Sequence, residues 1–160
     1  IGHIVIEEND LLCRCGRTGC LETVASARAV TQRVQALAHL PEPISIEGLE
    51  ALFFAGDPIA REVVIDAGHY LGKAIGSLVG TLNIKKIILT GDMTGFGEPW
   101  LDAVKQTMTR TALERMTQET EIEFGKLDYQ ACILGSSAHL LLDNYSLLFT
   151  QPQNHRFGTG

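Results

Sequence analysis

The chain has 160 residues, a formal net charge of -6 and a hydrophobic content of 45%. This length allows one ordinary domain or one lobe of a larger protein, but not two full domains. The acidic charge argues against a surface built to attract nucleic-acid phosphates. Lysines and glycines interrupt the most apolar region, residues 67–90, so no run approaches the ~20 residues that span a bilayer. The start of the chain also lacks the pattern of a secretory signal, which indicates a cytoplasmic protein.

The first residues alternate in the manner of a β-strand. Ile4 and Ile6 fall on one face of this predicted strand, and no methionine precedes it. Because the sequence begins in the middle of what reads as an element, we expect it to be a fragment of a longer protein.

Three of the four cysteines lie close together in the stretch CRCGRTGC. Glycines between Cys13, Cys15 and Cys20 allow the tight turns that would aim three thiols at one point. With the upstream His3 the set becomes Cys3His. Tetrahedral zinc suits four thiolate and imidazole ligands best, and a closed shell of four implies a structural site.

Two other interpretations of the cysteines remain open, a disulfide framework and unrelated reduced thiols. The C-x-C-x4-C spacing differs from the commoner C-x2-C of zinc fingers. Disulfides fit poorly, because the distant Cys132 offers no evident pairing and lies in an apolar run typical of a core residue. Zinc is therefore favoured. A metal-bound imidazole has a second nitrogen for an outward hydrogen bond, so His3 is also a candidate ligand-binding residue.

Helical periodicity follows the cysteines. It predicts one amphipathic helix from Thr23 to about Leu40, which ends before the prolines at positions 41 and 43. A shorter helical segment is expected from Ser45, with Phe53 and Phe54 buried near its end.

The clearest helix start in the chain is at Asp57, which is predicted to be the N-cap, with Pro58 in the first turn. This helix is expected to run to about Leu82. Glycines recur along it at a four-residue spacing, at positions 68, 72, 76 and 80. Such a stripe favours close packing against another helix over close approach of a ligand.

Residues 84–90 are predicted to form a buried strand that ends at Gly91 and Asp92. A strand, a small-residue turn and a helix often hold a phosphate at the strand's C-terminal end. Gly91 and Asp92 are therefore candidates for nucleotide binding, although the turn matches no complete phosphate motif.

The remaining pattern predicts a helix over 98–116, a strand near 121–125 and a last helix over about 132–148. Residues 151–160 are expected to be a flexible tail. The alternation of strands and helices predicts an α/β architecture.

The motifs together resemble the ROK family of sugar-responsive repressors, open reading frames and sugar kinases. The resemblance is carried by Gly2-His3, the ten-residue gap, the run C-x-C-G-x-x-G-C-L-E that ends at Glu22, and the following Ala25-Ser26. It covers about residues 1–150. It implies the actin-like ATPase (ribonuclease-H-like) fold, with this chain as most of the C-terminal lobe for sugar binding and oligomerisation.

The resemblance also implies roles for individual residues. His3, Cys13, Cys15 and Cys20 would bind zinc, and His3 and Glu22 would contact sugar hydroxyls. On local evidence alone, the favoured interpretation of Glu22 is an acid at a helix N-terminus, where the helix dipole stabilises it. The family's catalytic Asp and first phosphate loop would lie outside this chain, so no catalytic residue is expected in it.

The resemblance allows two functions for the parent protein. The family's kinases usually have a second glycine where this chain has Asp92, whose carboxylate would repel a phosphate. Residues 141–149 also resemble the C-terminal extension of repressors that respond to glucose or N-acetylglucosamine. Both features favour a transcriptional regulator. The resemblance implies that such a regulator binds a monosaccharide or amino sugar, forms a homodimer and contacts DNA through a missing N-terminal domain. The alternative is an ATP-dependent kinase of a hexose or amino sugar.

Overall fold

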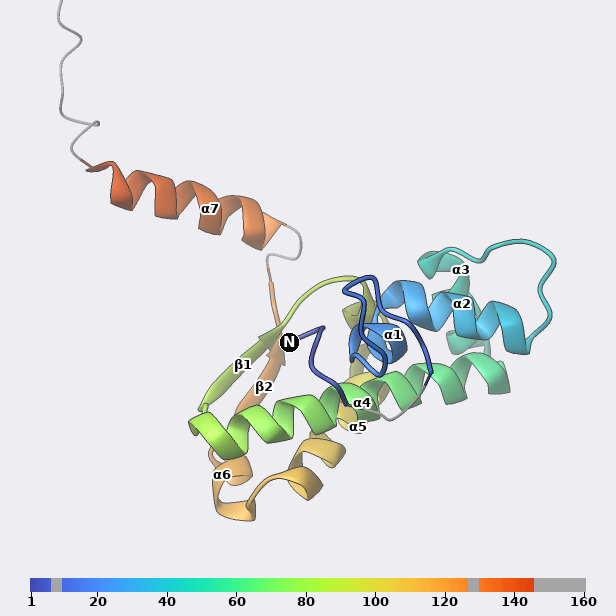
Figure 1. The fold of residues 1–160 in the computed structure, drawn as a ribbon, viewed down its shortest axis with the longest axis horizontal. Coiled ribbons are helices and arrows are strands. Elements are labelled where there is room, and N and C mark those ends of the chain that lie inside the picture. Colours follow the sequence, from blue (N-terminus) through green and yellow to red (C-terminus); the bar gives the residue numbers. More distant parts are fainter. Residues whose placement is uncertain (7–9, 127–129, 146–160) are drawn as a thin grey trace, which may run out of the picture. The chain divides into compact units, whose positions relative to one another are not determined.

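A computed structural model describes residues 1–6, 10–126 and 130–145. The chain divides into two compact units, residues 1–125 and 126–160. The second unit contributes the helix α7 (Gln130–Asp143). The elements of the first unit, shown in Figure 1, are in chain order α1 (Glu22–Ala25), α2 (Ala27–Leu37), α3 (Ile46–Ala55), α4 (Pro58–Leu82), β1 (Lys86–Leu89), η1 (Asp92–Phe96), α5 (Gly97–Thr111), α6 (Glu114–Gln118) and β2 (Glu121–Phe124).

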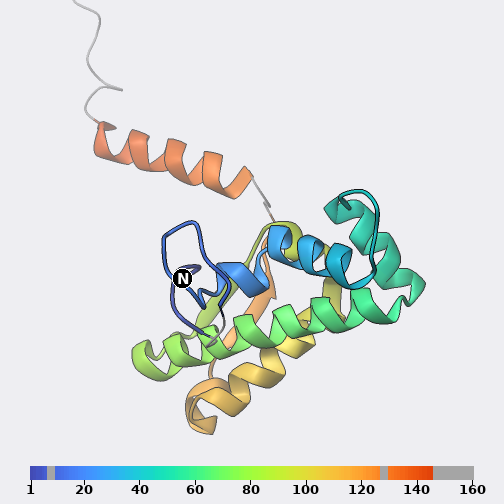
Figure 2. The ribbon, with the colours of Figure 1, turned by 45° about the vertical axis from the view of Figure 1, so that its right-hand side comes forward.

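The core of the first unit forms where α4 lies along α5, as both Figure 1 and Figure 2 show. Glycines on α4 make the close approach possible. A Cβ added to Gly72 would lie 2.5 Å from the Val104 carbonyl oxygen, and one added to Gly68 would lie 3.0 Å from that of Trp100. The glycine stripe is therefore a helix-packing surface, as the sequence predicted.

The start and end of α4 are also confirmed. The Asp57 carboxylate accepts a hydrogen bond from the backbone N–H of Ala60 at 2.8 Å, and Pro58 is the first helical residue. The helix ends at Asn83, whose φ of 51° is left-handed. Asparagine tolerates this conformation better than most residues do.

The prediction of one helix over residues 23–40 is wrong, because the chain breaks at Ser26. Its backbone is extended, with φ -77° and ψ 152°. The Ser26 hydroxyl donates to the Glu22 carbonyl oxygen at 2.7 Å and accepts from the Ala29 N–H at 3.2 Å. Serine thus closes α1 and caps α2, a local competition with helical backbone bonding that hydrophobic periodicity does not reveal.

A second predicted helix is also divided. The expected helix over 98–116 ends at Ala112, whose backbone is extended, and α6 follows as a separate turn.

The predicted burial of two phenylalanines near the end of α3 is confirmed for one of them. Phe53 is buried, but Phe54, predicted to be buried beside it, is 60% exposed. The two rings pack edge to face with their centroids 5.3 Å apart, so Phe53 shields only one side of Phe54.

The two predicted downstream strands form a parallel pair. Lys86 of β1 is opposite Glu121 of β2, and the register continues to Leu89 opposite Phe124. The prediction that β1 is buried is wrong for its outer face, since Ile88 is 56% exposed. The expected N-terminal strand is likewise absent from the described residues 1–6, where Val5 makes one isolated bridge to Cys20.

The last predicted helix, expected over about 132–148, is present as α7, which begins at Gln130 and ends at Asp143. The expected helical residues 146–148 and the tail over 151–160 lie outside the described residues, as does the Cys132 side chain. Among the described helices, none is long and apolar enough to cross a membrane.

Replacing Gly72 by alanine is expected to lower the free energy of unfolding by about 1–3 kcal/mol, because the added Cβ would collide with the α5 backbone. The matched control is Gly80→Ala, where the nearest atom is 3.7 Å away and the better helix propensity of alanine is expected to stabilise by up to about 1 kcal/mol. Urea unfolding followed by circular dichroism compares the variants. Equal stabilities would contradict the packing role of the stripe.

Candidate metal centre and ligand site

The cysteine loop is folded back onto the start of the chain by backbone hydrogen bonds. The N–H of Ile6 donates to the Gly19 carbonyl oxygen, and the N–H of Leu21 donates to that of Ile4, both at 2.9 Å. Gly16 and Gly19 have φ values of 85° and 74°. This left-handed backbone is costly for most other residues, so the two glycines of the motif are required by the turns.

This folding gathers the four predicted metal ligands. The Nδ1 or Nε2 atom of His3 and the sulfurs of Cys13, Cys15 and Cys20 all lie within 4.8 Å of one another. The Cys15 and Cys20 sulfurs are 3.5 Å apart, and the Cys13 sulfur is 3.5 Å from His3 Nδ1. A tetrahedral zinc ion with Zn–S bonds of about 2.3 Å needs S–S separations of about 3.8 Å. The donor set and its spacing therefore fit zinc.

Crowding of the thiols changes their acidity. Burial, together with the neighbouring Cys15 and Cys13 thiols, raises the pKa of Cys20 to about 12. The exposed Cys15 has its pKa lowered, chiefly by a hydrogen bond from the backbone of Arg17. A metal-free cluster thus keeps the Cys20 proton at neutral pH. A divalent cation would displace that proton and neutralise the thiolates, which is the usual reason for clustering such side chains.

Glu22 lies directly beside the cluster. Its Oε2 atom is 3.4 Å from His3 Nδ1, and its Oε1 atom is 2.7 Å from Arg14 Nε. The Glu22 backbone N–H donates to the Gly2 carbonyl oxygen at 2.8 Å, which ties the start of α1 to the start of the chain. Glu22 is the first residue of α1, as the helix-dipole interpretation requires, but its carboxylate also contacts two side chains of the candidate site.

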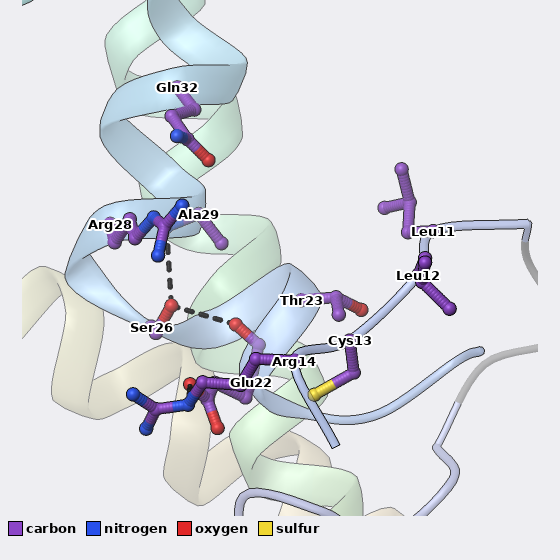
Figure 3. A pocket seen from close by; sticks show the side chains of 10 residues that line it. All are labelled: Leu11, Leu12, Cys13, Arg14, Glu22, Thr23, Ser26, Arg28, Ala29 and Gln32. Atoms are coloured by element: carbon purple, nitrogen blue, oxygen red, sulfur yellow. Dashed lines mark hydrogen bonds and ion pairs between the residues drawn. The ribbon is translucent and has the colours of Figure 1, made fainter. Parts of the chain in front are cut away.

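A cavity of about 380 Å³ opens between the cysteine loop and the beginning of α2 (Figure 3). Figure 3 shows Arg14 and Glu22 side by side at its edge, below Ser26. The remaining lining residues are Leu11, Leu12, Cys13, Thr23, Arg28, Ala29 and Gln32.

Sequence reasoning found Glu22 but missed the polar residues around it. Arg14 lies between two predicted zinc ligands, so its place in the loop could have indicated a role near the site. Arg28 and Gln32 are one helical turn apart on α2, a spacing that places them on the same face. Hydrophobic periodicity gives no reason to single out that polar face.

The candidate nucleotide residues lie elsewhere in the first unit. Gly91 and Asp92 follow β1 and begin η1, and neither lines the cavity beside the cysteines. The Asp92 side chain is exposed. The Glu50 carboxylate of α3 approaches Gly95 in the same turn, so a second acid lies near the place where a phosphate would be expected.

Comparison with known proteins agrees with these motifs. The model of the ROK family matches residues 1–143. The DNA-binding transcriptional dual regulator NagC of Escherichia coli K12 is 31% identical over 140 residues, covering 83% of this chain and 34% of that protein. A glucokinase of Halalkalibacterium halodurans is 34% identical over 148 residues, covering 84% of this chain and 45% of the kinase.

Solved structures agree as well. The ROK hexokinase of Thermus thermophilus superposes with a TM-score of 0.74 at 26% identity, over 89% of this chain and 48% of that one. Such structural neighbours are ROK kinases of the actin-like ATPase fold, which agrees with the α/β architecture seen here. The chain spans less than half the length of the two curated relatives. By its family match and its fold, the chain belongs to the ROK family.

Proposed function

We propose that this chain is the sugar-sensing and oligomerisation lobe, residues 1–150, of a cytoplasmic ROK transcriptional regulator. The observation that carries the proposal is the Cys3His cluster with Glu22 against it, beside a cavity that Cys13 and Glu22 line. The similarity to an E. coli DNA-binding regulator supports the choice of regulator. DNA binding would belong to a separate N-terminal domain of the parent protein.

The residues fit a structural zinc ion held by His3, Cys13, Cys15 and Cys20. When bound, zinc would fill a closed tetrahedral shell and would hold the loop rather than activate water. Since Nδ1 of His3 faces the Cys13 sulfur, that nitrogen suits the metal and Nε2 suits a ligand. The cluster would thus fix the imidazole in a defined orientation.

The proposed sugar contacts are His3 and Glu22. A carboxylate accepts hydrogen bonds from paired hydroxyls, and an oriented imidazole adds a donor or an acceptor, which suits the rim of a pyranose. The adjoining cavity, about 380 Å³, lies in the range of about 300–1,000 Å³ usual for small-molecule sites. The ligand class is a monosaccharide or an amino sugar.

The proposed mechanism is a shift between two conformations. A sugar held by His3 and Glu22 in the cleft between the lobes of the parent protein would favour one interlobe angle. In a homodimer that angle would set the separation of the two DNA-binding domains, and hence the match to operator half-sites. Zinc would couple sugar binding to this change by keeping the cysteine loop rigid.

The second candidate function is an ATP-dependent sugar kinase, which the similarity to a glucokinase favours. Against it, Asp92 stands in the turn after β1 and the Glu50 carboxylate contacts Gly95 of the same turn. Two acids would repel ATP phosphates unless a metal ion intervened. ATP-dependent phosphorylation of a hexose or amino sugar by the parent protein would establish the kinase and overturn the regulator.

Replacing Cys20 by serine is expected to abolish zinc retention, because it removes a fully buried member of the proposed ligand set. Elemental analysis of the purified chain should find about one zinc ion per wild-type chain and a small fraction of that in the variant. Cys132→Ser is the matched control and should keep the metal. In the parent protein, Cys20→Ser should also abolish sugar-responsive DNA binding. A sugar response that survives loss of zinc would contradict the coupling.

Replacing Glu22 by glutamine is expected to weaken sugar binding by roughly 10- to 100-fold, because a charged acceptor for hydroxyls is lost. Zinc content should stay unchanged, since Glu22 is not one of the four ligands. Titration calorimetry of the parent protein against hexoses and amino sugars measures the affinity, with the exposed Glu42→Gln as control. Unchanged affinity in Glu22→Gln would leave only the helix-dipole role for this residue.

A further inference from the structure

We propose that Cys15 and Cys20 form a disulfide on exposure to peroxides, and that this bond dismantles the metal centre. The effect on the metal rests on the proposed zinc site. The bond itself rests only on the positions of the thiols. Their sulfur atoms are 3.5 Å apart, and a disulfide requires about 2.05 Å. A shift of about 1.5 Å therefore suffices, and the loop between the two cysteines contains the glycines at positions 16 and 19.

Exposure distinguishes the three thiols of the cluster. Cys13 is 3% exposed and Cys20 is 0% exposed, whereas Cys15 is exposed to solvent. An oxidant from solvent must reach a sulfur directly, so Cys15 is the thiol that meets it first. The Cys20 sulfur, in contact with Cys15, is placed to complete the bond. Cys13 also belongs to the cluster, but it is buried, and its sulfur lies 3.5 Å from His3 Nδ1.

The reaction balances with hydrogen peroxide as a two-electron oxidant. The Cys15 thiolate attacks one peroxide oxygen, the O–O bond breaks, and a sulfenic acid and hydroxide form. The Cys20 thiol then attacks the Cys15 sulfur, the S–O bond breaks, and the Cys20 proton leaves with the hydroxide as water. One further proton converts the first hydroxide to water. Overall, one thiolate and one thiol are oxidised to a disulfide, peroxide is reduced to two waters, and a dithiol reductant reverses the change.

Loss of Cys15 and Cys20 as ligands would leave only His3 and Cys13 for the metal. Two donors are too few to hold a structural zinc ion against solvent. Glu22 lies two residues after Cys20, and its carboxylate contacts His3. Oxidation would thus act on the loop that lies against the proposed sugar contacts, and would make the sugar response of the parent protein sensitive to peroxides.

The test exposes the purified 160-residue chain to hydrogen peroxide, once metal-free and once loaded with zinc. Remaining thiols are then alkylated in denaturant, and the disulfide is mapped by mass spectrometry. A chromogenic chelator measures released zinc. The expected product is a Cys15–Cys20 bond with Cys13 alkylated, formed in both samples, with one zinc released per bond in the loaded sample.

Two variants sharpen the test in the metal-free state. Cys15→Ser removes the exposed thiol and should abolish disulfide formation under the same treatment. Cys132→Ser should leave the Cys15–Cys20 bond unchanged. A bond that contains Cys13, a disulfide in Cys15→Ser at the wild-type rate, or only sulfinic and sulfonic acids on Cys15 would overturn the inference.

The outcomes separate this inference from the proposed function. If the reduced chain binds no zinc but the Cys15–Cys20 bond forms, the metal site is wrong and the dithiol stands. If zinc binds and the bond does not form, the proposed metal site stands and the dithiol inference fails.

Discussion

The site depends on the folding of the cysteine loop onto the first residues of the chain. Backbone hydrogen bonds from Ile6 to Gly19 and from Leu21 to Ile4 bury Cys20 and place Glu22 at the start of α1. That fold brings three thiols and an imidazole within 4.8 Å of one another. Cys13 and Cys20 are buried in this cluster, whereas His3 and Cys15 are exposed. The proposed metal ion would neutralise the thiolates that the fold gathers here.

The loop is supported by the helical core of the first unit. Leu21 and Val24 are buried, so α1 is anchored through its apolar face to the packing around α4. An ion pair of 3.1 Å between Arg33 and Asp66 also links α2 to α4. Because α5 approaches α4 closely at the α4 glycines, this framework has little room to deform. The candidate ligand residues therefore project from a rigid base, which a sensor needs if ligand contacts are to change a distant geometry.

Features set by local chemistry could be predicted from the sequence. The spacing of the cysteines and the Asp57-Pro58 pair are strong local signals. The four predicted ligands lie together, and α4 begins at Pro58 with Asp57 as its N-cap, as expected. The break at Ser26 could not be predicted, because a serine inside an apolar period is compatible with both a continuous helix and a cap. The contact of Arg14 with Glu22 depends on how the loop folds back, a tertiary fact that spacing does not contain.

Predictions of burial failed where the burial of a side chain depends on whether another helix or strand covers it. Phe54 and Ile88 are apolar and follow the expected pattern, yet each is more than half exposed. The sequence pattern indicates which face of an element is apolar, but not whether another element covers that face.

The central claim is that His3, Cys13, Cys15 and Cys20 hold one zinc ion, and X-ray absorption at the zinc edge tests it most directly. On the purified chain, we predict a four-coordinate shell with three sulfurs at about 2.3 Å and one nitrogen at about 2.0 Å. A shell of oxygens and nitrogens, or one with fewer than three sulfurs, would contradict the metal centre and the account of the loop built on it.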